Sequence, residues 1–137
     1  MYRCRHFHIK ELVDPDTYES RGDRSWELLD SRILKAIDLI RDDHGPVIVN
    51  NWHSGGHLKY RGFRPHDTPV GARLSQHRYG RAFDFHTPET PLEAVYEAIK
   101  SEKYWMVSTI EDIEATPTWI HVDCRNNLQD GIRVVNP

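Results

Sequence analysis

The sequence SQHRYGRAFDF occupies residues 75–85 and brings a histidine, a glycine and an aspartate close together along the chain. We expect His77 to lie in a turn, because Gly80 allows the chain to reverse sharply soon after it. The strand that follows then returns Asp84 to the neighbourhood of His77, and Ala82 on the same strand face leaves room beside both. A neutral imidazole and a carboxylate are suitable zinc ligands, each needing a reach of about 2 Å. The stretch therefore predicts two ligands of one metal site.

A second stretch, TWIHVDC at 118–124, is predicted to be a neighbouring strand. Its alternation separates two faces, with Ile120, Val122 and Cys124 on one and Trp119, His121 and Asp123 on the other. A strand that turns an imidazole and a carboxylate away from its apolar side is not built for core packing alone. His121 is therefore the predicted third metal ligand.

These two stretches carry a family resemblance. SQHRYGRAFDF resembles the SxHxxGxAxD motif of zinc peptidases that cut D-Ala-D-Ala and related cell-wall peptides, a superfamily that includes lysostaphin and the hedgehog signalling domain. WIHVD resembles the second motif of that family, an aromatic-x-His-x-polar strand. The opening HFHIKEL and the order of the later elements are similar to the phage-type members, so the resemblance covers most of the chain. It implies that His77, Asp84 and His121 bind Zn²⁺, with water in the fourth position.

The general base is the part of the site in which the chain departs from the family pattern. Relatives carry a glutamate shortly before the last zinc-binding histidine, but Thr118 stands three positions before His121, so the commonest Glu-x-x-His arrangement is absent. Glu111 matches the glutamate that ends the preceding strand in relatives, and we predict it to be the base. Glu114 and Asp123 are the alternatives. Glu114 is expected to be a solvated carboxylate, and Asp123 could instead hold a ligand or the bound water.

Relatives also use an arginine upstream of the first ligand to bind a substrate carboxylate, because a guanidinium can hold both oxygens. The family's SGYR at this strand end reads NNWHS here, so the expected arginine is displaced or missing. Arg61 and Arg73 are the candidates from this segment, which also contains Arg64. The histidines of the same segment could line the cleft: His53, His57 and His66.

Three further residues are expected to support the site rather than react. Ser75 should hold the His77 turn by hydrogen bonding, since no adjacent base would make it a nucleophile. Gly80 supplies the turn, and Trp119 accompanies His121 on its strand face.

Elsewhere the patterns predict an α+β fold, a single small domain (1–137) with a central antiparallel sheet and flanking helices. Apolar residues at helical spacing predict a helix over 25–43, and Thr90-Pro91-Leu92-Glu93 predicts a capping box that opens a second helix ending near 101. Residues 14–24 and 53–74 are predicted loops. The predicted strands are 46–52, 81–86, 105–111, 118–124 and 132–135.

The composition and charge of the chain argue against several classes of protein. The chain has 137 residues, 38% of them hydrophobic and 28% charged, which is typical of a soluble globular domain. A net charge of -3 gives no sign of nucleic-acid binding, and no apolar run reaches the roughly 18–20 residues of a membrane span. Cys4 and Cys124 are expected to be free thiols. The start is not a secretory signal, so a protein made in the cytoplasm is expected, and phage-mediated release would be a separate route to a cell wall. A monomer is also expected.

The resemblance implies a metallopeptidase that hydrolyses a D-residue-containing peptide of peptidoglycan, using metal-activated water and a carboxylate base. Two alternatives stay open. A non-catalytic, zinc-stabilised binding or virion-associated module would keep the ligands and lose the base, and a cytoplasmic peptidase would act on ordinary L-peptides.

Overall fold

A four-stranded sheet organises the molecule in the computed structural model, which describes residues 1–137. The strands are β1 (Ala82–Phe85), β2 (Thr109–Glu111), β3 (Ile120–Asp123) and β4 (Arg133–Val135), in the order β1-β3-β2-β4. β3 is antiparallel to both of its neighbours. The α+β class predicted from the sequence is confirmed.

The expectation of a purely antiparallel sheet needs a correction, because β4 pairs parallel to β2. The chain reverses after β3, so β4 runs opposite to β3. Both edges of β3 are already paired with β1 and β2. β4 therefore adds to the free edge of β2, and because β2 also runs opposite to β3, the two strands are parallel. The C-terminal strand is brought beside β2 as a result.

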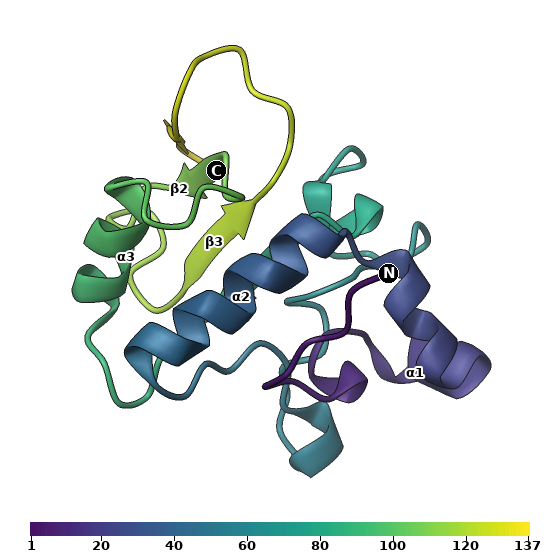
Figure 1. Ribbon diagram of the computed structural model, residues 1–137. Helices are drawn as coiled ribbons and strands as arrows, with labels where there is room; N and C mark the ends of the chain where they lie inside the picture. The colour runs from purple at the N-terminus through teal and green to yellow at the C-terminus, as the bar shows by residue number, and fades with distance from the viewer.

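Three helices surround the sheet: α1 (Pro15–Arg21), α2 (Ser31–His44) and α3 (Leu92–Lys100). α2 is the longest and lies between α1 and α3, which are on opposite sides of the molecule (Figure 1). None of these helices is both long and apolar enough to cross a bilayer.

The predicted loop over 14–24 is wrong, since it contains α1. The sequence signal for this helix is present: the Asp14 side chain accepts a hydrogen bond from the Thr17 amide, and Pro15 occupies the first turn. The helix predicted over 25–43 begins later, at Ser31, where Asp30 caps it by accepting from the Arg32 amide. A 3-10 segment, Gly22–Leu28, takes up the preceding residues.

The predicted capping box at Thr90 is also wrong, although α3 follows closely where expected. The Thr90 hydroxyl donates to the His44 carbonyl oxygen at 2.5 Å, and α3 has no side-chain cap. Thr90 thus ties the start of α3 to the end of α2 instead of closing the helix on itself.

Two predicted strands are shorter than expected. Of 46–52, Ile48 alone pairs, as an isolated bridge to His86. The backbone amides of the residues that follow form hydrogen bonds outside the sheet: Asn50 donates to the Glu11 carbonyl oxygen and Asn51 to the Leu58 carbonyl oxygen. Of 105–111, the last three residues form β2.

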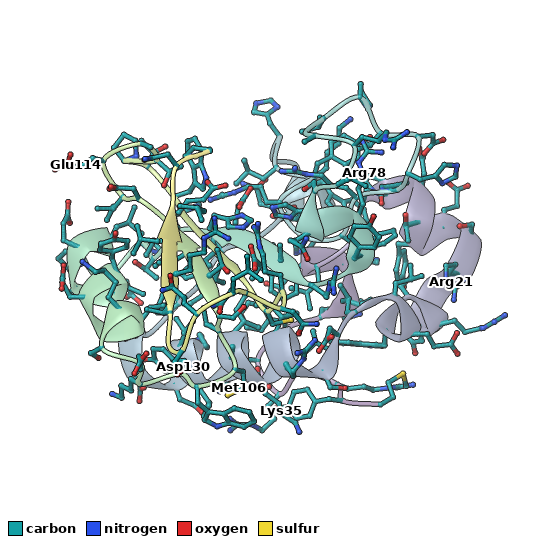
Figure 2. The ribbon with its side chains drawn as sticks, turned by 90° about the horizontal axis from the view of Figure 1, so that it is seen from above. Arg21, Lys35, Arg78, Met106, Glu114 and Asp130 are labelled. Atoms are coloured by element: carbon teal, nitrogen blue, oxygen red, sulfur yellow. The ribbon has the colours of Figure 1, made fainter.

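The core lies between α2 and one face of the sheet. Ile33 and Ile37 of α2 belong to the same buried apolar cluster as Phe83 of β1 and Val122 of β3. Figure 2 shows α2 along one side of the molecule, with the segments that carry Glu114 and Arg78 on the opposite side. The face of β1 and β3 turned away from the core is thereby left for polar side chains. Both cysteines are free, as expected.

Candidate metal centre

The turn that carries His77 is a 3-10 helix, Gln76–Tyr79, supported at both ends. The Ser75 hydroxyl accepts a hydrogen bond from the His77 amide at 3.4 Å. Gly80 has a φ of +67°, and a Cβ there would lie 1.8 Å from the carbonyl oxygen of Leu28. Only glycine fits this combination of positive φ and close approach. Ser75 and Gly80 therefore lie where their supporting roles require.

Strand pairing brings the other two residues together, because Asp84 of β1 lies directly opposite His121 of β3. Oδ1 of Asp84 is 2.8 Å from Nδ1 of His121 and 3.2 Å from Nε2 of His77. The three side chains can place their ligand atoms within 4.8 Å of one another, so this group is close enough to bind a metal ion. The sequence prediction that these three residues converge is confirmed.

Both imidazole rings are held with one nitrogen turned towards this centre. Nδ1 of His77 donates to the Gly62 carbonyl oxygen at 2.9 Å, which leaves Nε2 facing Asp84. Nε2 of His121 lies 2.9 Å from Oδ2 of Asp123, which leaves Nδ1 facing Asp84. Hydrogen bonds of this kind fix the tautomer and orientation of metal-binding histidines. The two rings are therefore set to offer a lone pair to one cation.

Asp123 lies behind His121 and is fully buried. Its carboxylate is held by Arg125, whose Nε donates to Oδ1 at 2.8 Å and whose Nη2 bonds to Oδ2. Burial alone would raise the pKa of Asp123, but the hydrogen bonds from His121 and Arg125 outweigh it and lower the pKa. Asp123 is thus an ionised group that orients His121 from the side away from Asp84.

The surrounding charges favour a cation at His121. Burial acts to lower the pKa of His121, but the carboxylates of Asp123 and Asp84 outweigh burial and raise it to about 9. Burial likewise acts to raise the pKa of Asp84, and the interactions with His77 and His121 hold it well below its usual range. Positive charge at this point, from a proton or a metal ion, is stabilised by the fold.

The group opens into a cleft of about 660 Å³. Glu111, at the end of β2, lies on its wall, with Oε1 3.9 Å from Nδ1 of His121. The Glu111 side chain is 18% exposed, and no protein group hydrogen-bonds to its carboxylate. Trp119 lines the same cleft, half-buried. Glu114 lies outside it, exposed in the turn after β2 (Figure 2).

The arginines of the cleft differ from those expected. Arg61 is not on its wall, since Nη1 of Arg61 bonds to Nδ1 of His86 at 3.0 Å, and Arg73 is not on the wall either. The arginines on the wall are Arg64, Arg125 and Arg133.

Two of these three arginines have carboxylate partners. Arg64 pairs with Asp84 and Arg125 with Asp123, whereas Arg133 makes no ion pair. Arg125 could have been found from the sequence, because it continues the alternation that starts at His121. Arg133 could not, because it reaches the cleft through the parallel pairing of β4. The exposed His53, His57 and His66 do not line the cleft.

Comparisons with protein-family models, with curated proteins and with solved structures found no match.

Proposed function

We propose that this protein is a zinc-dependent peptidase that cuts a D-residue-containing peptide of the bacterial cell wall. The observation that carries the proposal is the Glu111 carboxylate, which has no hydrogen-bond partner and lies on the cleft wall, 3.9 Å from a buried group of two histidines and one aspartate. A buried metal-binding group that served structure alone would not need a further carboxylate, free of hydrogen bonds, at its open side. The kind of peptide is taken from the resemblance of residues 75–85 and 119–123 to cell-wall peptidases.

The donor set suits zinc. Two imidazole nitrogens and one carboxylate oxygen, with a fourth position open, are typical of catalytic zinc sites. Harder ions such as Mg²⁺ and Ca²⁺ prefer sites made mostly of oxygen atoms. His77, Asp84 and His121 would hold the ion. Bound there, zinc would lower the pKa of a water molecule and polarise a peptide carbonyl.

Glu111 is the group that would move the proton. Its carboxylate is too far from His121 to be hydrogen-bonded to it, and it faces the cleft in which a substrate would lie. A carboxylate in this position can accept a proton from water and return it to the leaving amine. Asp123 is left to orient His121, because its oxygens face His121 and Arg125 rather than the cleft.

Arg133 is our candidate for binding the substrate carboxylate, in place of Arg61 and Arg73. It is the cleft arginine without an acidic partner, so its guanidinium is available for a bidentate contact. Trp119 and Val135 give the same cleft an apolar contact surface. The substrate we expect is therefore a peptide with a free carboxylate near the bond that is cut.

The test compares two synthetic peptides of one sequence, one ending in D-Ala-D-Ala and the other in L-Ala-L-Ala. The zinc-loaded protein should release free alanine from the D-form only. Equal cleavage of both would support a peptidase for ordinary L-peptides. A zinc-loaded protein that cleaves neither these peptides nor purified peptidoglycan would support a non-catalytic binding module.

A further inference from the structure

The two oxygens of the Asp84 carboxylate have different partners. Oδ1 faces the histidines, 2.8 Å from Nδ1 of His121 and 3.2 Å from Nε2 of His77. Oδ2 faces the other way and accepts a hydrogen bond from Nη2 of Arg64 at 3.3 Å. One oxygen is thus directed to the metal-binding group, and the other is already engaged by a cation.

Arg64 is itself fixed at several points. Its Nε donates to the carbonyl oxygen of Tyr60 at 2.7 Å, and its backbone amide donates to the carbonyl oxygen of His77 at 3.1 Å. The side chain is 12% exposed. Gly71 covers the guanidinium so closely that a Cβ there would lie 2.5 Å from Nη1. The guanidinium is therefore held beside Asp84 by contacts on more than one side.

A carboxylate can bind a metal through one oxygen or through both, and the second mode takes an additional coordination position. A catalytic zinc site depends on a position left open for water. A charged donor that holds the second oxygen works against the two-oxygen mode, because the hydrogen bond to Oδ2 would have to be given up.

We propose that Arg64 is a positioning residue that keeps Asp84 a one-oxygen ligand and so preserves the open coordination position of the metal. This rests on the proposed metal-binding role of His77, Asp84 and His121. It does not depend on the peptidase activity, because it concerns how the ion is held.

The experiment uses Co²⁺ in place of zinc, because its visible absorption reports coordination number: four-coordinate Co²⁺ absorbs strongly and higher-coordinate Co²⁺ weakly. The wild type should show the strong four-coordinate band. Arg64→Met, which keeps the length of the side chain and removes the donors, should bind Co²⁺ but lose the strong band as Asp84 adds its second oxygen. Arg64→Lys, which retains a charged donor, should recover the band in part.

Arg61→Met is the matched control, since Arg61 is a nearby half-buried arginine that contacts His86 outside the cleft. Its Co²⁺ spectrum should match that of the wild type. An Arg64→Met protein with the wild-type band would overturn the proposal, even if its metal affinity fell. A raised KM with an unchanged spectrum would show instead that Arg64 contacts the substrate.

A crystal structure of the zinc-loaded wild type gives a second measurement that needs no variant. Oδ1 of Asp84 should bind the ion, and Oδ2 should stay with Arg64. If both oxygens bind the ion, the proposal fails whether or not Arg64→Met folds. If the wild type binds Co²⁺ but cuts no peptide, only the proposed peptidase activity is contradicted. If it binds no metal, both the peptidase activity and the role of Arg64 are contradicted.

Discussion

Nε2 of His121 lies 2.9 Å from Oδ2 of Asp123, on the side of the ring away from Asp84. The two residues stand on the same strand, two positions apart, so the extended backbone of β3 sets this contact. The same contact fixes which nitrogen of His121 faces the cleft. It also turns the Asp123 carboxylate away from the cleft.

Asp123→Asn should weaken zinc binding without removing it. An amide can still contact His121, but it lacks the charge that favours a cation there. Loss of an outer partner of this kind commonly costs about 10–100-fold in metal affinity or activity. Zinc affinity measured by chelator competition, and activity measured at saturating zinc, separate the two effects. If the Asp123→Asn protein binds zinc fully but has no activity, Asp123 rather than Glu111 would be the general base.

Glu111→Gln should retain the fold and zinc but reduce peptide hydrolysis by a factor of about 100 or more, the usual size of a general acid–base contribution. Initial rates on the D-Ala-D-Ala peptide measure this. Glu114→Gln is the matched control, because Glu114 is exposed and outside the cleft, and it should keep the wild-type rate. Equal losses in the two variants would argue against Glu111 as the base.

Arg133→Gln should raise the KM for a peptide with a free terminal carboxylate and leave its kcat less affected. A hydrogen bond to a charged group is worth about 1.5–3 kcal/mol, so the expected rise is on the order of 10–100-fold. The same variant should treat an amidated peptide as the wild type does. Arg73→Gln, outside the cleft, serves as the control. Unchanged KM for the free carboxylate would remove Arg133 from the site.

His121→Ala and Val122→Ala should give opposite results. His121→Ala leaves two protein ligands and should abolish tight zinc binding, measured as metal content after dialysis. Val122 is fully buried in the core, and its truncation should cost about 1–3 kcal/mol of stability while zinc stays at one equivalent. Retained zinc in His121→Ala, with loss in Val122→Ala, would contradict the alternation along β3.

Zinc affinity should depend on pH through His121. Without metal, the pKa of His121 is raised from 6.5 to about 9. Protonation of His121 therefore stabilises the folded protein fully below pH 6.5, and this stabilisation is lost as the pH rises through about 9. This proton competes with metal for the ring. Apparent zinc affinity should therefore rise across that interval, while the metal-free protein becomes less stable. Chelator competition and thermal unfolding at several pH values measure both trends. An affinity that is flat over this range would contradict the shift.

Local pattern was enough to predict that His77, Asp84 and His121 converge. Period-two alternation separates His121 from Val122 on β3, and the glycine turn at residue 80 brings His77 back towards β1. Both signals depend on residues close in sequence. The wrong prediction at 14–24 concerned a local signal, the Asp14 cap, whereas the wrong prediction at Thr90 came from a hydrogen bond to a residue far away in the sequence. Asp14 capped a helix, and Thr90 bonded to the end of α2.

The remaining features of the site depend on tertiary contacts with no local signal. Arg133 reaches the cleft because β4 adds to the free edge of β2, and the sequence predicted a strand there without its partner. Arg64 meets Asp84 only after its chain segment folds over the His77 turn. Spacing along the chain does not tell which arginine reaches a cleft, so the two candidates Arg61 and Arg73 were chosen without this information, and both lie outside the cleft.

The close approach of Gly80 to Leu28 bears on how much of the chain a metal-binding unit needs. The three residues of the candidate metal centre and Glu111 lie between residues 77 and 121, yet the His77 turn rests on the end of the 3-10 segment before α2. There the Asp30 amide also donates to the Gly80 carbonyl oxygen at 2.9 Å. A fragment cut before Ser75 would contain every donor atom but neither this support nor the Gly62 carbonyl oxygen that orients the His77 ring. Zinc binding would then require that the N-terminal half is folded against the sheet. The two sequence motifs alone, placed in another protein, would not form the metal-binding group.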